Sequence, residues 1–221
     1  MPKKSLLDEM IAQTKLSKKQ TDKQQKIVEA AVKMFASNGY ANTSTSEIAK
    51  VAGVSEGTIF RHYGTKDNLL LAVILPFIKE SLPSMAENVF KEVFLEDESF
   101  ESFLRALIIN RWHFLSDNKE LFKVIVKELL YNENLKNELL PFFTENILKR
   151  LNKVIDYYKS RGELMDLPSE KVLKMMLTVI FGYFVSEFVL FPVASDEIKD
   201  KDFDTIVRFI MDGIRKETVE G

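Results

Sequence analysis

The sequence predicts an all-α protein, with a small N-terminal group of three helices followed by a larger helical domain. Apolar residues recur at helical spacing almost throughout the chain, and no stretch shows the alternation of a β-strand. Half of the eight glycines lie between residues 39 and 64, so the tightest turns are expected there. The 221 residues, 46% of them hydrophobic and 29% charged, suffice to bury the core of one large domain or two small ones.

Composition excludes several kinds of active site. The chain has no cysteine, which rules out disulfide bonds, thiolate zinc sites and cysteine nucleophiles. Its two histidines, His62 and His113, are far apart in sequence, so a histidine-based metal centre or catalytic triad has few places to form. Glu128 and Glu133 are interpreted as exposed helix charges. The sequence therefore predicts no catalytic residues, no metal and no cofactor.

The N-terminal residues and the most apolar stretch bear on where the protein is located. The first residues lack an apolar run long enough for a signal peptide, which predicts a cytoplasmic protein. In the apolar stretch 172–193, only twelve residues separate Lys174 from Glu187. A membrane-spanning helix needs about 18 or more. We therefore expect a helix buried by protein, and no membrane partner.

Charge is unevenly distributed along the chain. Residues 1–66 contain 11 Lys and Arg against 6 Asp and Glu, a net charge of +5. Residues 67–221 contain 20 against 27, a net charge of −7. This asymmetry favours a polyanionic partner for the N-terminal part alone.

A first helix is expected after a polar, lysine-rich arm of residues 1–22. The helix ends at the Asn-Gly pair 38–39, because glycine there permits the backbone to turn. Its buried face is a stripe at helical spacing, made of Ile27, Ala30, Ala31, Met34 and Phe35.

Two short helices are expected next, at 45–51 and 56–62. Ser44 and Glu47 form a capping box that opens the first, because a hydroxyl and a carboxylate three residues apart satisfy free backbone donors. Ser55 is expected to cap the second.

The four residues 52–55 between these helices give the layout of a helix-turn-helix. Gly53 can adopt the left-handed conformation of a tight turn, and Ala49 is small enough for close packing. Ile48 and Ile59 supply shared apolar contacts. This spacing alone leaves DNA binding and a purely structural pair of helices equally open.

The rest of the chain is expected to form long helices. Thr65 should cap a fourth helix, which Pro76 and Pro83 kink or break. Pro141 should bend a later helix, whereas Pro168 stands near a helix start, where a missing N–H costs little. The later helices are expected at 84–95, 99–116, 119–131, 134–160, 169–191 and 202–217.

A dense pattern of particular residues runs through residues 35–70. It comprises Phe35, Gly39, Tyr40, Thr43, Ile48, Ala49, residues 52–55, Gly57, Thr58, Phe60, His62, Tyr63, Lys66, Leu69 and Leu70. This pattern resembles the DNA-binding region of tetracycline-repressor-like (TetR-family) bacterial transcriptional regulators. The resemblance implies a helix-turn-helix domain at 23–66 and an effector-binding and dimerisation domain at 67–221. The second of these resembles the family only in the number and length of its helices.

The resemblance implies that the second short helix enters the major groove of double-stranded operator DNA. Arg61 is expected to read a base, since its fork fits guanine, and Lys66 to contact a phosphate. Phe60 stands where the family more often has Tyr, which removes one possible phosphate hydrogen bond. The DNA-binding residues expected are Thr43, Ser46, Ser55, Gly57, Thr58, Phe60, Arg61, His62 and Lys66.

Structural interpretations stand beside these roles. Ser55 and Thr65 are equally explained as helix caps, and His62 as a hydrogen-bonding residue within the domain. Tyr63 is interpreted as a core residue, and Glu56 as a partner of the helix dipole.

The resemblance also implies an effector cavity and a homodimer, in which the final two helices pair with those of a second chain. Fifteen of the 17 phenylalanines follow residue 66, which favours a small apolar or amphipathic effector. The expected lining residues are Asn110, Trp112, His113, Phe143, Met176, Phe181, Tyr183, Phe184 and Glu187. The expected dimer residues are Val172, Val179, Ile180, Phe203, Ile206, Val207, Ile210 and Ile214.

The function expected is therefore that of a ligand-responsive transcriptional regulator, a repressor rather than an activator because that is the habit of the family. A helical enzyme or lipid-binding protein with a purely structural helix-turn-helix is the main alternative, but it lacks a catalytic constellation. A nonspecific architectural DNA binder is disfavoured by the small positive charge of residues 1–66.

Overall fold

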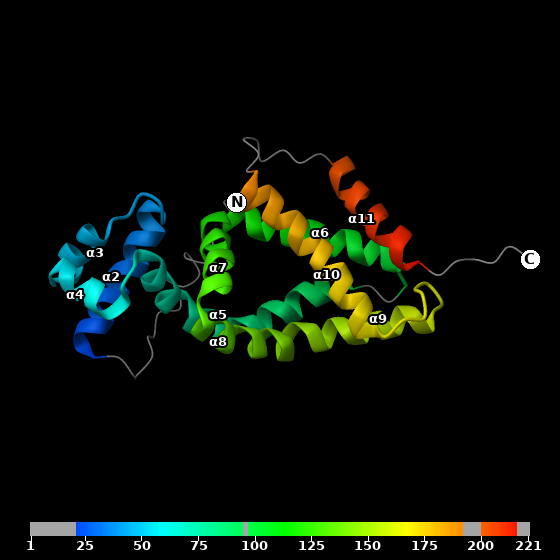
Figure 1. The fold of residues 1–221 in the computed structure, drawn as a ribbon, viewed down its shortest axis with the longest axis horizontal. Helices are drawn as coiled ribbons and strands as arrows, with labels where there is room; N and C mark the ends of the chain where they lie inside the picture. The colour runs from blue at the N-terminus through cyan, green and yellow to red at the C-terminus, as the bar shows by residue number, and fades with distance from the viewer. Residues whose placement is uncertain (1–20, 95–96, 192–199, 216–221) are drawn as a thin grey trace, which may run out of the picture. The chain divides into compact units, whose positions relative to one another are not determined.

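The computed structural model confirms the predicted all-α fold. It describes residues 21–94, 97–191 and 200–215. Within these ranges the regular structure consists of the helices α2 to α11 and two π-helical turns, η1 and η2, apart from one isolated bridge between Leu164 and Arg215. The chain divides into two compact units, Met1–Leu82 (unit 1) and Pro83–Gly221 (unit 2) (Figure 1). The domain boundary expected after residue 66 stays a prediction.

Unit 1 contains three short helices and the first part of a long one. They are α2 (Asp22–Asn38), α3 (Thr45–Ala52), α4 (Glu56–Tyr63) and α5 (Lys66–Val93). α2 begins at a capping box formed by Thr21 and Gln24 and ends at Gly39, whose φ is 80°. The last two residues of the expected arm thus belong to the start of α2, and residues 1–20 lie outside the described residues.

The core of unit 1 forms where α2 packs against α3, and α3 against α4. The predicted stripe of α2 is buried there, except for the partly exposed Met34. Side chains from all four helices contribute, among them Ile27, Phe35, Ile48, Ile59, Leu69, Leu70 and Ile74, each at most 1% exposed. Removing these apolar side chains from water holds the short helices together, since helices of eight residues are not stable alone.

α5 runs past Pro76 and Pro83 without ending, but it is bent between Glu80 and Pro83, so the kink expected at Pro83 is confirmed. The helix expected at 84–95 is the last part of α5. Each proline removes one backbone hydrogen bond. Buried side chains on both sides of the prolines, including Phe77, Ala86 and Val93, stabilise the helix nonetheless.

Within the described residues, unit 2 consists of the last part of α5, six further α-helices and two π-helical turns. The six α-helices are α6 (Phe100–Asp117), α7 (Lys119–Tyr131), α8 (Glu133–Phe143), α9 (Lys149–Ser160), α10 (Ser169–Val185) and α11 (Asp200–Ile214). Figure 1 shows α8 and α9 following one another along one edge of the unit, with α10 crossing in contact with α9.

Two of the expected long helices are interrupted by π-helical turns. The helix expected at 134–160 is divided by η1 (Thr144–Leu148), just after Pro141, whose missing N–H disturbs the regular ladder. The helix expected at 169–191 ends in η2 (Ser186–Leu190). Together α10 and η2 are long and apolar enough to cross a membrane by length and composition.

The core of unit 2 is rich in aromatic rings that contact one another edge-on or at a tilt. At one end, Phe100 and Phe103 pack around Tyr158, with ring centroids 5.2 and 6.0 Å from the tyrosine. At the other end, the ring of Trp112 lies 4.4 Å from that of Phe188. Exposed side chains of α6 also form two ion pairs towards the C-terminal segment, Arg105–Asp204 at 2.7 Å and Arg215–Glu101 at 2.6 Å.

Candidate nucleic-acid interface and effector region

The turn between α3 and α4 has the geometry that the sequence predicts. Gly53 lies in the left-handed region, with φ 68° and ψ 35°. The amide of Val54 donates to the carbonyl of Ala49 at 3.0 Å, which closes the turn. At the start of α3, the Glu47 amide donates to Ser44 Oγ and the Ser44 amide to the Glu47 carboxylate, so the capping box is confirmed. The hydrogen bonds from Ser44 lower the pKa of Glu47.

A side-chain hydrogen bond that the sequence analysis missed ties the two short helices together. Thr45 Oγ1 donates to Glu56 Oε1 at 2.6 Å. Glu56 therefore holds α4 against α3, in addition to its favourable position at the helix N-terminus. The two residues are eleven positions apart, so no local pattern predicts the bond.

α4 buries one side and exposes a polar side. Ile59 is 1% exposed and anchors the helix in the core of unit 1. Gly57, Arg61 and His62 are exposed, and so is the ring of Phe60, at 48%. Such a surface lets the helix approach another molecule without disturbing the core.

The hydroxyl of Ser55 does not make the capping hydrogen bond that the sequence predicts. Ser55 is the N-cap residue of α4, but its side chain does not cap a backbone amide. Its hydroxyl instead pairs with that of Thr58 at 2.9 Å. By contrast, Thr65 does cap α5, because its hydroxyl accepts from the amide of Asn68 at 3.0 Å.

Thr43 is a correction to the expected DNA contacts. Its side chain is buried, at 2% exposed, and its hydroxyl contacts the carbonyls of Gly39 at 2.8 Å and Met34 at 3.2 Å. Thr43 therefore fastens the loop between α2 and α3 through its hydroxyl. Ser46, on α3, is exposed as a DNA contact requires.

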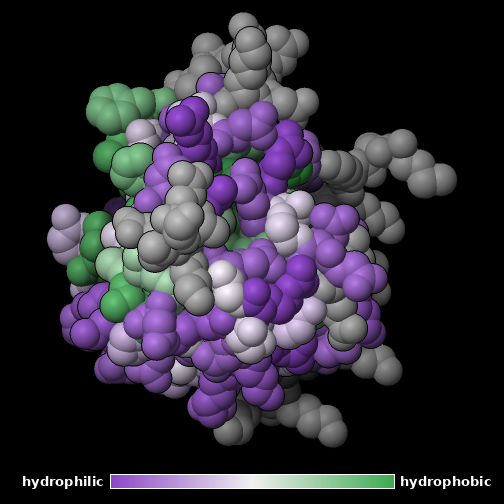
Figure 2. Space-filling model, turned by 90° about the vertical axis from the view of Figure 1, so that its right-hand side faces the viewer, coloured by the Kyte–Doolittle hydropathy of each residue, from purple (hydrophilic) through white to green (hydrophobic). Residues whose placement is uncertain are grey.

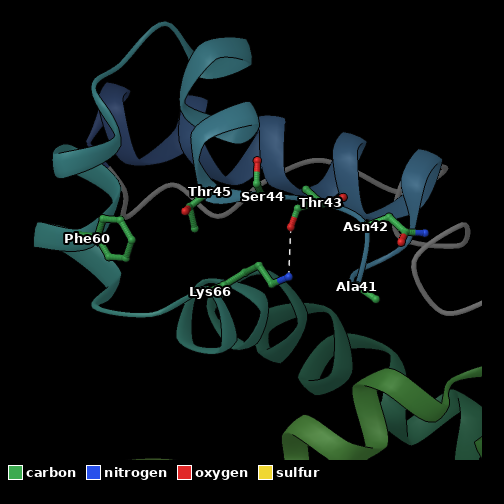
Figure 3. A pocket seen from close by; sticks show the side chains of 7 residues that line it. All are labelled: Ala41, Asn42, Thr43, Ser44, Thr45, Phe60 and Lys66. Atoms are coloured by element: carbon green, nitrogen blue, oxygen red, sulfur yellow. Dashed lines mark hydrogen bonds between the residues drawn. The ribbon is translucent and has the colours of Figure 1, made fainter.

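Lys66 lies at an open hollow of about 390 Å³ between the α2–α3 loop and α4 (Figure 3). Its ammonium group donates to the carbonyls of Tyr40 at 3.0 Å and Thr43 at 3.1 Å, and lies 4.2 Å from the centroid of the Tyr40 ring. An ammonium has three donors, so one remains for a further acceptor. The hollow is lined by Ala41, Asn42, Thr43, Ser44, Thr45, Phe60 and Lys66.

The sequence predicts a core position for Tyr63, and the structure shows this side chain partly buried. Its phenol oxygen is buried and has no hydrogen-bond partner within the part of the chain that the structure describes. Burial raises the pKa of this tyrosine. The exposed ring of His62 lies 6.3 Å from that of Tyr63.

The residues expected around an effector are only partly brought together. Trp112, Met176 and Phe184 are buried in one cluster, and the Tyr183 ring lies 6.2 Å from that of Trp112. Phe181 contacts Phe122 at 6.2 Å between ring centroids, but it is 49% exposed.

Two of the expected effector residues are corrected. His113 is exposed, because it follows Trp112 by one residue and Trp112 turns into the core. Phe143 lies at the end of α8 and is 38% exposed, outside the core cluster.

Tyr183 and Glu187 lie next to one another in a partly buried, negatively charged environment. Burial, with the negative charges of Glu187 and Asp202, raises the pKa of Tyr183 to about 12. Burial, followed by the charge of Asp202, also raises the pKa of Glu187.

Asn110 has neighbours that the sequence analysis did not anticipate. Its Nδ2 donates to Glu92 on α5 at 2.7 Å, and its Oδ1 accepts from the guanidinium of Arg111. Arg111 was missed, although a signal is visible in the sequence. It lies on the same helical face as Leu107, Ile108 and Leu115, where a charge is unusual.

Most of the expected dimer residues are buried within their own chain. α11 packs its apolar stripe against α6 and α10. Buried in this way are Val172, Ile180, Phe203, Ile206, Val207, Ile210 and Ile214, whereas Val179 is partly exposed. Other apolar side chains in this region are exposed. They are Met175 and Phe181 of α10, Leu190 of η2, Phe191 just after it, and Phe209 of α11.

The fold and the exposed face of α4 define a helix-turn-helix DNA-binding protein with a larger helical domain. Residues 27–73 match the family model described as bacterial regulatory proteins of the tetR family. This match confirms the predicted recognition of a DNA-binding region of the TetR family. Among the described residues, no group of three His, Cys, Asp or Glu side chains could hold a metal ion.

The chain is similar to known transcriptional regulators over most of its own length and most of theirs. The chain is 25% identical over 188 residues to a fatty acid metabolism regulator protein of Bacillus subtilis, covering 83% of this chain and 90% of that protein. It is 26% identical over 167 residues to the transcriptional repressor AcnR of Corynebacterium glutamicum, covering 75% and 81%.

A solved structure shares the fold. FadR of Thermus thermophilus, a TetR-family transcriptional repressor crystallised with lauroyl-CoA, superimposes with a TM-score of 0.58 at 20% identity. The match covers 90% of this chain and 98% of that one. The family model and the curated relatives confirm the predicted function of a transcriptional regulator.

Proposed function

We propose that the protein is a cytoplasmic repressor that binds its operator through the exposed face of α4 and leaves it when an effector binds unit 2. One observation carries this proposal. α4 is anchored by the buried Ile59 and presents Gly57, Arg61 and His62 to solvent. A helix that is held from one side and free on the other can enter a major groove intact.

The exposed residues suit different parts of duplex DNA. The Arg61 guanidinium can donate two hydrogen bonds to the O6 and N7 of a guanine. Ser55 and Thr58, at the N-terminal end of α4, and Lys66, with its remaining donor, suit phosphate oxygens. Ser46 on α3 can reach the backbone beside them.

The test is a mobility-shift titration on the DNA upstream of the gene. Arg61→Ala should lose about 1–3 kcal/mol of binding free energy and relax the choice of one base pair. Lys66→Ala should weaken binding to all sequences alike and lower the salt dependence by about one charge. Lys33→Ala, which changes an exposed cation of α2, is the control. Equal behaviour of the Arg61 and Lys66 variants would contradict these roles.

We further propose that two copies form a symmetric dimer. One short recognition helix reads few base pairs, and a two-fold dimer places two of them in major grooves about 34 Å apart. Exposed apolar side chains at Met175, Phe181 and Phe209 require cover from another molecule. In the view of Figure 2, most of the hydrophobic side chains that can be seen lie on the left side, among largely hydrophilic ones.

A fatty acyl compound is the effector class that we favour. The Bacillus subtilis relative is named for fatty acid metabolism, and the Thermus thermophilus repressor binds lauroyl-CoA. The aromatic core of unit 2 around Trp112 and Phe184 offers apolar surface of the kind that an acyl chain contacts. The enzyme alternative is not favoured, since these relatives are regulators.

A further inference from the structure

Arg111 interrupts an apolar face of α6. Leu107 and Leu115 lie one turn before and after it, and both pack against the core of unit 2. Ile108, three residues earlier, is fully buried. A cation in such a place loses hydration, so its presence needs a compensating partner.

Within the described part of the chain, the side chains in direct contact with the Arg111 guanidinium are uncharged. Its Nε and Nη2 both donate to the Oδ1 of Asn110, at 3.1 and 2.5 Å. Its guanidinium carbon lies 4.8 Å from the ring centroid of Phe114. A guanidinium has five N–H donors, and these contacts use two.

The carboxylate of Glu92, whose charge acts on Arg111, does not pair with it directly. Glu92 accepts a hydrogen bond from Asn110 Nδ2 at 2.7 Å, so the amide stands between the two charges. Burial lowers the pKa of Arg111, and the negative charge of Glu92 opposes this effect without cancelling it. Over the residues that the structure describes, the guanidinium forms no ion pair, and its positive charge is incompletely compensated.

We propose that Arg111 binds the anionic end, a carboxylate or a phosphate, of an amphipathic effector. The inference rests on the proposed function, which places an effector in unit 2. The free N–H donors match the paired oxygens of such a group. Asn110 is a positioning residue, because both ends of its amide are engaged in holding the guanidinium against Glu92. Trp112, the next residue, turns into the aromatic core, where an apolar chain would lie.

The single tryptophan of the chain, Trp112, provides the readout. Its fluorescence is titrated with four twelve-carbon amphiphiles below their micelle concentrations: laurate, lauroyl-CoA, uncharged dodecanol and cationic dodecyltrimethylammonium. The proteins are the full-length wild type, Arg111→Met and Arg111→Lys. Arg105→Met is the control, because it removes a guanidinium of the same helix that pairs with Asp204.

The expected result is a loss selective for anions. Arg111→Met should weaken laurate and lauroyl-CoA by about 10- to 100-fold, because a charged hydrogen bond is lost, and leave dodecanol unchanged. Arg111→Lys should retain most of the affinity, and Arg105→Met all of it. A loss confined to laurate identifies a carboxylate, and one confined to lauroyl-CoA identifies a phosphate.

Three results would overturn the inference. In the first, both anions bind Arg111→Met as tightly as the wild type. In the second, dodecanol loses as much as the anions, which indicates a structural role for Arg111. In the third, the wild type prefers dodecyltrimethylammonium. If the wild type binds none of the four compounds, the acyl effector of the proposed function fails as well, while operator binding through Arg61 is tested separately.

Discussion

α4 and α10 both present one face to solvent, but the two faces have opposite character. α4 buries Ile59 and exposes Arg61 and His62, which water solvates well. α10 buries Met176 and exposes Phe181, at 49%. A polar exposed face is stable by itself and available to a transient partner such as DNA. An apolar exposed face is stabilised when a second protein surface covers it.

The largest expected effect tests whether α10 and α11 bind a second copy. Phe209→Glu puts a charge on an exposed ring of α11, at 69% exposed, and should convert the dimer to a monomer in light scattering. Because two tethered recognition helices bind together, operator affinity should fall by about 100-fold or more.

Arg208→Ala is the matched control, since Arg208 is the neighbouring exposed residue and pairs with Asp212 of its own helix. It should remain dimeric. A dimeric Phe209→Glu variant with normal operator affinity would show that this face of α11 is not the interface.

The two units also differ in how far their structure could be predicted from the sequence. In unit 1 the capping box of Ser44 and Glu47 and the left-handed Gly53 are local, so neighbouring residues determine them. The contact of Lys66 with the carbonyl of Tyr40 could not be predicted, because it joins residues 26 positions apart. Nor could the buried position of Thr43, which the family pattern alone assigns to a DNA contact.

In unit 2 the sequence predicts helices but not what each helix covers. The stripe of Phe203, Val207 and Ile210 indicates burial, and burial is what the structure has. Periodicity does not say whether the covering surface belongs to the same chain or to another. The same limit applies to Arg111, whose environment depends on a neighbouring helix that carries Glu92.

A second, intermediate effect separates the conformation of the turn from the surface of α4. Gly53 has φ 68°, and no atom lies within 4 Å of the position that a Cβ would take, so Gly53→Val suffers only from the left-handed backbone. It should lose about 1–2 kcal/mol of unfolding free energy in urea denaturation, and operator binding with it.

Gly57→Ala is the contrasting variant. Gly57 has ordinary helical geometry and open space around it, so alanine should stabilise α4 by about 0.5–1 kcal/mol. Operator binding should nevertheless weaken, because the added methyl faces the DNA. In Gly53→Val, stability and operator affinity should fall together. If they also change together in Gly57→Ala, Gly57 does not lie at the interface.

The smallest expected effect concerns the pH dependence of unit 2. Because the pKa of Glu187 is raised in the folded protein, the native state holds its proton more tightly than the unfolded state does. This contribution to stability is present below the unfolded pKa of about 4.5 and is lost as the pH rises through the folded value. At pH 7 the ionised Glu187 is therefore unfavourable, and Glu187→Gln should raise Tm by about 1–2 °C. At pH 4 the difference should shrink, since the wild-type carboxyl is then largely protonated in both states.

Asp202→Asn is the companion variant, because it removes the second cause of the raised pKa of Glu187. It should give part of the same gain in Tm at pH 7. A lower Tm for Glu187→Gln at pH 7, measured by scanning calorimetry, would mean that the carboxylate has a favourable partner in the assembled dimer. Glu187 would then belong with the exposed apolar face of α10, as part of a surface that a second copy completes.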